Sequence, residues 1–128
     1  MPNEEIKFSW RARAKSFGYA WAGVKSLLQT EHNAWIHLAL TIVALLLGWL
    51  LHISRLEYAA LFIVMALVWI CEIFNTCIEK TMDFLSHEHH PQIKLIKDMA
   101  AAAVLIMAVV AVLVGCLIFV PRIVALLQ

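Results

Sequence analysis

The chain has 128 residues, enough for one domain, and its formal net charge is only +1. Hydrophobic residues make up 63% of it and charged residues 15%, against about 45–50% and about 25% in soluble domains. A soluble domain of this size could not bury so much apolar surface. The near-neutral charge also argues against nucleic acid as the main partner, because phosphate binding requires a basic surface.

Residues 8–30 are predicted to form an amphipathic helix. Phe17, Trp21, Val24 and Leu28 recur with helical spacing along one face, and basic residues lie between them. Aromatic and basic residues on such a helix favour a position in the membrane interface. A cytosolic helix packed on the rest of the protein is the alternative.

Three apolar stretches follow, at about residues 34–52, 56–85 and 97–120. Each is long enough to cross a hydrocarbon core of ~30 Å, which takes roughly 20 apolar residues. No helix breaker interrupts the second stretch, so one helix is predicted to continue to about Leu85, with a turn at residues 86–90. The third span is expected to end at Pro121. The sequence therefore predicts one all-α integral membrane domain, residues 1–128, with a surface helix and three transmembrane helices.

The distribution of basic residues predicts the topology. Five lie within the first 30 residues, and Lys80, Lys94 and Lys97 flank the loop between the second and third spans. The opposite side carries only Arg55 and Arg122. By the positive-inside rule, the N-terminus and this loop are expected in the cytoplasm. The polar end of the second span then faces the compartment that contains ATP.

The second span ends in a row of polar residues. Glu72, Asn75, Glu79 and Asp83 are spaced i, i+3, i+7 and i+11, which places them within roughly 80° of one another on a helix. Residues 59–71 are apolar apart from one indole, so Glu72 is expected inside the hydrocarbon zone. An intramembrane carboxylate costs at least ~2.5–3.5 kcal/mol and by default indicates a functional site. Glu72 is the candidate general base; a hydrogen bond that only fixes helix packing is the alternative.

Two further groups lie at the same predicted membrane face. Glu31, at the junction of the surface helix and the first span, could converge with Glu79 on Mg²⁺, a hard cation that takes oxygen ligands. A helix-terminus role for Glu31 is equally open. Lys97 and Asp98 begin the third span, where a lysine can neutralise phosphate charge or anchor the helix at the interface.

Two other kinds of site are not supported. The sequence has no GxxxxGK(S/T) segment and no glycine-rich phosphate loop, which excludes a soluble-type kinase nucleotide site. The histidines His87, His89 and His90 are interpreted as a polar loop, because zinc would normally require a fourth ligand.

The segment EIFNTCIEKTMD, from Glu72 to Asp83, resembles the motif E-x-x-N-S/T-x-I/L-E-x-x-x-D of the bacterial diacylglycerol kinase family, which includes the undecaprenol kinases. The segment EHNAWIH, residues 31–37, resembles the family's entry into its first span. Lys97 and Asp98, followed by an alanine run, resemble its third span. The resemblance covers residues from about 8 to 119, and its details lean toward the undecaprenol kinase branch.

This resemblance implies a homotrimer in the bacterial cytoplasmic membrane, with cytoplasmic active sites shared between neighbouring subunits. It implies transfer of the γ-phosphate of ATP, with Mg²⁺, to the hydroxyl of a lipid alcohol, either diacylglycerol or undecaprenol. Glu72 matches the family's catalytic base, and Glu31 and Glu79 match its metal-binding carboxylates. The residues that match nucleotide and phosphate positions are Lys15, Tyr19, Asn75, Lys97 and Asp98. Asp83 matches a motif position whose role the resemblance does not define.

Two other function classes compete with a kinase. An oligomer with rings of Glu72 could conduct cations, and a small membrane subunit could lack enzymatic activity altogether. A conduit requires polar residues across the whole membrane, whereas the outer part of every predicted span is apolar. A non-enzymatic subunit predicts no ATP turnover by the purified protein.

Overall fold

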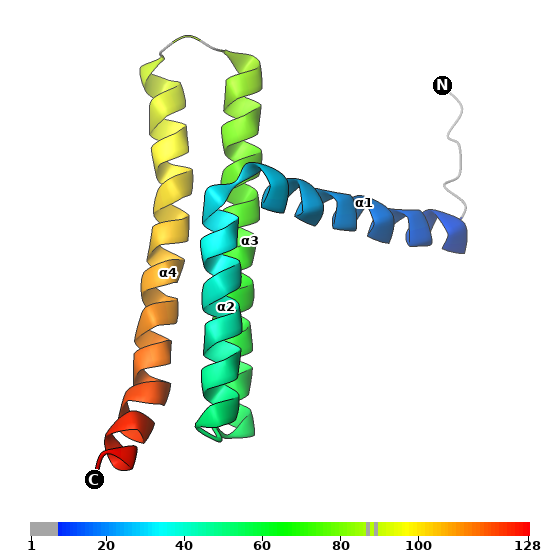
Figure 1. Ribbon diagram of the computed structural model, residues 1–128. Helices are drawn as coiled ribbons and strands as arrows, with labels where there is room; N and C mark the ends of the chain where they lie inside the picture. Colours follow the sequence, from blue (N-terminus) through cyan, green and yellow to red (C-terminus); the bar gives the residue numbers. More distant parts are fainter. Residues whose placement is uncertain (1–7, 87, 89) are drawn as a thin grey trace.

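The computed structural model describes residues 8–86, 88 and 90–128, and over these residues the only regular secondary structure is helical. The helices are α1 (Trp10–Thr30), α2 (His32–Leu50), α3 (Arg55–Leu85) and α4 (Pro91–Leu126). In Figure 1, α2, α3 and α4 run side by side and α1 projects away from them at a steep angle. As predicted, α2, α3 and α4 are long and apolar enough to cross a membrane. His87 and His89 of the predicted polar loop lie outside the described residues.

Helix α3 begins with a capping box. The backbone N–H of Glu57 donates to the Ser54 hydroxyl at 3.3 Å, and the backbone N–H of Ser54 donates to the Glu57 carboxylate at 2.6 Å. Backbone donors at the helix start are thereby satisfied. The helix then runs without interruption through Glu72 to Leu85, as predicted. Its length of about 46 Å exceeds the ~30 Å of a hydrocarbon core, so part of it extends beyond that core.

Helix α4 differs from the prediction at its C-terminal end. The predicted end at Pro121 is wrong, because the helix continues through this residue to Leu126. Proline removes one backbone donor from a helix, but membrane helices tolerate it where neighbouring groups and local adjustments compensate. At the other end, Pro91 occupies the first turn, where its fixed φ suits a helix start. Residues 92–97 therefore belong to the same continuous helix as the third predicted span.

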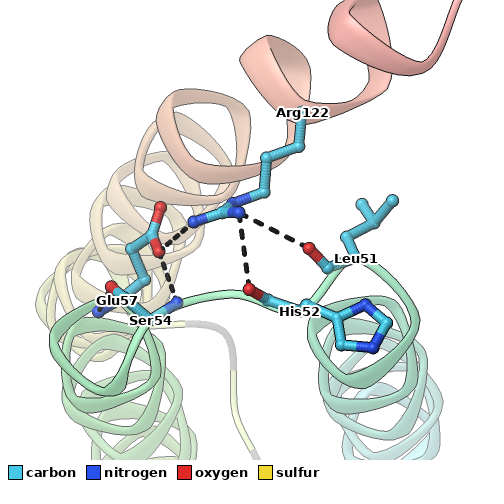
Figure 2. Close-up of polar contacts among 5 residues, drawn as sticks. All are labelled: Leu51, His52, Ser54, Glu57 and Arg122. Atoms are coloured by element: carbon cyan, nitrogen blue, oxygen red, sulfur yellow. Dashed lines mark hydrogen bonds and ion pairs between the residues drawn. The ribbon is translucent and has the colours of Figure 1, made fainter.

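Arg122 ties the end of α4 to the turn between α2 and α3 (Figure 2). Its guanidinium donates to the backbone carbonyls of Leu51 and His52, each at 3.4 Å, and to the carboxylate of Glu57. His52 in this turn has φ of 49°, a left-handed conformation that is uncommon for residues other than glycine. These contacts join α2, α3 and α4 at the end opposite the α3–α4 turn (Figure 1).

The buried core is small. Ile53, Leu61 and Ile118 form its centre, near the end of the bundle that Arg122 closes. Most large apolar side chains of α2, α3 and α4 are exposed on the single chain. Because lipid tails are as apolar as leucine, such faces are suited to contact with lipid or with another membrane helix.

Candidate active site

The polar face of α3 borders a cavity of about 340 Å³. Glu72, Asn75 and Glu79 line it from α3, Asn33 and His37 line it from α2, and small and apolar residues of α4 complete it. We call it the polar cavity. The helical spacing of Glu72, Asn75 and Glu79 predicted that they share one face, and the structure brings all three to this cavity.

Glu72 is the most deeply buried of these residues, with 2% of its surface exposed. Its Oε2 atom has no hydrogen-bond partner among the described residues. His37 Nε2 lies 3.7 Å from this oxygen, and the charges of Glu31 and Glu79 also act on Glu72. A buried carboxylate with few hydrogen-bond donors around it can act as a proton acceptor.

Asn75 and Glu79 present oxygen atoms about one and two helical turns further along α3 than Glu72. Asn75 Nδ2 donates to Glu79 Oε1 at 3.3 Å. The Asn75 Oδ1 atom is buried and has no hydrogen-bond partner among the described residues. Carboxylate and amide oxygens are ligands that Mg²⁺ accepts, so the donor chemistry here fits a hard divalent cation.

Glu31 lies at the break between α1 and α2, and Lys80 of α3 reaches it. Lys80 Nζ is 3.5 Å from Glu31 Oε1 and donates to Thr30 Oγ1 at 2.7 Å. This contact places Glu31 beside Lys80, the residue that follows Glu79 in the sequence. Within the described part of the chain, no three or more His, Cys, Asp or Glu side chains group closely enough to hold a metal ion. Other oxygen ligands, such as water and substrate phosphate, would therefore complete the coordination of any ion held here. Lys80 was predicted only as a basic residue of the cytoplasmic face, not as a residue of the site.

A second cavity, of about 630 Å³, lies at the α3–α4 turn, and we call it the turn cavity. Asp83, Lys97 and Asp98 all line it. Lys97 Nζ donates to Asp83 Oδ1 at 2.9 Å, whereas Asp98 pairs with Lys94 on the preceding turn of α4. Asp83 therefore has a structural partner that the sequence did not indicate.

Lys15 and Tyr19 are set apart from the other predicted site residues. Both lie exposed on α1 and line neither the polar cavity nor the turn cavity. The structure also places His37 at the polar cavity, although His37 was not a predicted site residue. The available signal was its ionisable side chain within an apolar span, which by default indicates function.

The family model for prokaryotic diacylglycerol kinase matches residues 18–119. The chain belongs to the prokaryotic diacylglycerol kinase family. It is therefore a lipid kinase, as the motif from Glu72 to Asp83 predicted. The matched range contains every predicted site residue except Lys15, which lies just outside it.

Curated relatives within the prokaryotic diacylglycerol kinase family carry two names. The undecaprenol kinase of Bacillus subtilis is 37% identical over 108 residues, which cover 84% of this chain and 88% of that protein. The diacylglycerol kinase of Synechocystis sp. is 36% identical over 113 residues, which cover 88% of this chain and 65% of that protein. The diacylglycerol kinase of Escherichia coli K12 is 32% identical over 110 residues, which cover 80% of this chain and 84% of that protein.

Proposed function

We propose that the protein transfers the γ-phosphate of Mg-ATP to the hydroxyl of a membrane lipid alcohol. Diacylglycerol and undecaprenol, which the relatives' names give, are the two acceptors to test. The observation that carries the proposal is the buried carboxylate of Glu72, placed in an apolar helix and in one cavity with Asn75 and Glu79. A lipid hydroxyl can reach this depth from the bilayer.

Glu72 acts as the general base in the proposed reaction. Its carboxylate accepts the proton of the lipid hydroxyl while the hydroxyl oxygen forms a bond to the γ-phosphorus. The bond between that phosphorus and the bridging oxygen of ATP breaks, and ADP leaves with the electron pair. Burial of Glu72 keeps water, a competing nucleophile, away from the reacting phosphate.

The remaining residues bind the nucleotide and its metal. Glu31 and Glu79 would hold Mg²⁺, which neutralises phosphate charge when it is bound. The other phosphate and nucleotide contacts are assigned to Asn75, Lys97, Asp98, Lys15 and Tyr19. Asp83 holds Lys97 in position through their ion pair.

The assignment of Lys15 and Tyr19 to the nucleotide is proposed together with a homotrimer. Because these residues line neither cavity of their own chain, we assign them to the nucleotide of a neighbouring subunit, with active sites shared across subunit contacts. Helix α1 would lie in the membrane interface, which its exposed Trp10, Phe17 and Trp21 support. The positive-inside rule then orients the N-terminus and the site to the cytoplasmic side of the bacterial inner membrane.

The test is a kinase assay with purified protein in mixed micelles, Mg-ATP labelled at the γ-phosphate, and either dioleoylglycerol or undecaprenol. The wild-type protein is expected to label at least one of the two lipids. Glu72→Gln should lower kcat by about 10²–10⁴-fold, the usual contribution of a general base, while the oligomer survives size-exclusion chromatography.

Glu57→Gln is the matched control, because it removes a carboxylate from the far end of the same helix. It should keep the wild-type kcat. Normal turnover by Glu72→Gln would show that another group is the base. A wild-type protein that phosphorylates no lipid alcohol would reject the proposed function.

A further inference from the structure

His37 lies where two cavities meet. Its side chain lines the polar cavity and also an apolar cavity of about 250 Å³, which runs between α2, α3 and α4. The side chain is only 15% exposed. An ionisable side chain in an apolar span requires a partner, and among the described residues the carboxylate paired with His37 is that of Glu72.

Two residues with no part in the proposed reaction, Trp69 and Thr41, contact His37. The Trp69 ring packs against it edge-on, with centroids 6.4 Å apart and planes at 64°. Trp69 Nε1 donates to Thr41 Oγ1 at 3.3 Å, and Thr41 Oγ1 donates to the backbone carbonyl of His37 at 2.7 Å. Indole and hydroxyl together therefore restrain the backbone and the ring of His37.

The restrained ring presents Nε2 to the buried oxygen of Glu72. The 3.7 Å between His37 Nε2 and Glu72 Oε2 is longer than a hydrogen bond. Catalytic hydrogen bonds are often long in the absence of substrate and shorten when it binds. Oε2 has no other hydrogen-bond partner among the described residues, so Nε2–H is the donor placed to fix this carboxylate.

We propose that His37 is a positioning residue for Glu72. Its Nε2–H orients the carboxylate so that the second oxygen faces the polar cavity and meets the lipid hydroxyl. The inference rests on the proposed function, because it takes Glu72 as the base. It predicts that the position of one N–H group, and not the imidazole ring as such, determines the rate.

The test compares His37→Gln with His37→Asn. The glutamine amide can place an N–H near the position of Nε2, whereas the shorter asparagine amide reaches only the position of Nδ1. His37→Gln should keep kcat within about threefold of wild type, and His37→Asn should lower it by about 10–100-fold, as a misplacement of about 1 Å can. The KM for ATP should stay unchanged in both variants, because the nucleotide contacts are assigned elsewhere.

A merely structural role of His37 predicts a different result. Both variants replace an imidazole with an amide, so loss of packing should lower the thermal midpoint and kcat of both together. Equal kcat values for the two variants, whether high or low, would overturn the inference. Thr41→Val is a second test that leaves His37 in place. It removes the hydroxyl that bonds the His37 backbone carbonyl and accepts from the Trp69 indole packed on the ring, and it should lower kcat without raising the KM for ATP. An unchanged kcat in Thr41→Val would overturn the proposed restraint.

The wild-type protein and Glu72→Gln separate this inference from the proposed function. If the wild type phosphorylates neither dioleoylglycerol nor undecaprenol, the proposed function fails. If the wild type is active, Glu72→Gln is inactive and His37→Asn keeps the full rate, only the positioning role of His37 fails.

Discussion

Gly48 offers a quantitative test of the packing at the closed end of the bundle. A Cβ atom at Gly48 would stand 2.9 Å from Ile53 Cδ1 and 3.1 and 3.2 Å from two ring carbons of Tyr58. Ile53 belongs to the buried cluster with Leu61 and Ile118, so it has little room to move. Overpacking of this kind costs about 1–3 kcal/mol, whereas replacing glycine with alanine in a helix gains about 1 kcal/mol.

Gly115→Ala is the matched variant for Gly48→Ala. Its Cβ would lie 4.0 Å from the nearest side-chain atom, in Phe119, which is ordinary van der Waals contact. Because both changes replace a helical glycine with alanine, the propensity gain cancels between them. Gly48→Ala should therefore be less stable than Gly115→Ala by about 1–3 kcal/mol, measured by equilibrium unfolding in mixed detergent and SDS. Equal or reversed stabilities would refute the close contact of Gly48 with Ile53 and Tyr58.

Three further predictions concern charges and the metal. Arg122→Gln should lower the stability in the same unfolding titration without changing kcat, because its contacts with Glu57 and the α2–α3 turn lie at the end opposite the proposed site. Lys97→Met should raise the KM for ATP by roughly tenfold, since a charged contact to phosphate is lost; Asp83→Asn should raise it less, because the lysine remains. Chelation of Mg²⁺ with EDTA should stop phosphate transfer, and excess Mg²⁺ should restore it. Unchanged stability of Arg122→Gln, an unchanged KM for ATP in Lys97→Met, or full activity in EDTA would each contradict the corresponding assignment.

The membrane helices were predictable because a bilayer leaves few alternatives to a chain with stretches of about 20 apolar residues. The uninterrupted course of α3 followed from the absence of proline and glycine between Arg55 and Leu85. The end of α4 was not predictable in this way. Proline is a local signal for a helix end, but the contacts of Arg122 with the α2–α3 turn are tertiary and tie the residue after Pro121 to the other helices.

In the candidate site, too, some features follow from local sequence and others depend on tertiary contacts. Glu72, Asn75 and Glu79 lie on one helix, so helix geometry alone brings them to one cavity. The pairs that join different helices, Lys80 with Glu31 and Lys97 with Asp83, depend on how the helices rotate and cross. In a membrane protein, lipid-facing and buried positions are both apolar, so the sequence pattern carries little information about that rotation. The pairing of His37 with Glu72 depends on the same rotation.

In the proposed reaction, α3 is long enough to contact both a lipid in the bilayer and a nucleotide in water. Glu72 lies about 25 Å along the helix from Arg55, and Asp83 lies about 16 Å further on. If the ~30 Å hydrocarbon core begins near Arg55, it contains Glu72 and ends before Asp83. Asp83 holds Lys97 of α4. The proposed base for a lipid hydroxyl and the partner of the proposed phosphate-binding lysine are therefore fixed on the same helix at different depths. The lipid can stay in the bilayer and the nucleotide in water, and their reacting groups meet in the space between, where Asn75 and Glu79 lie.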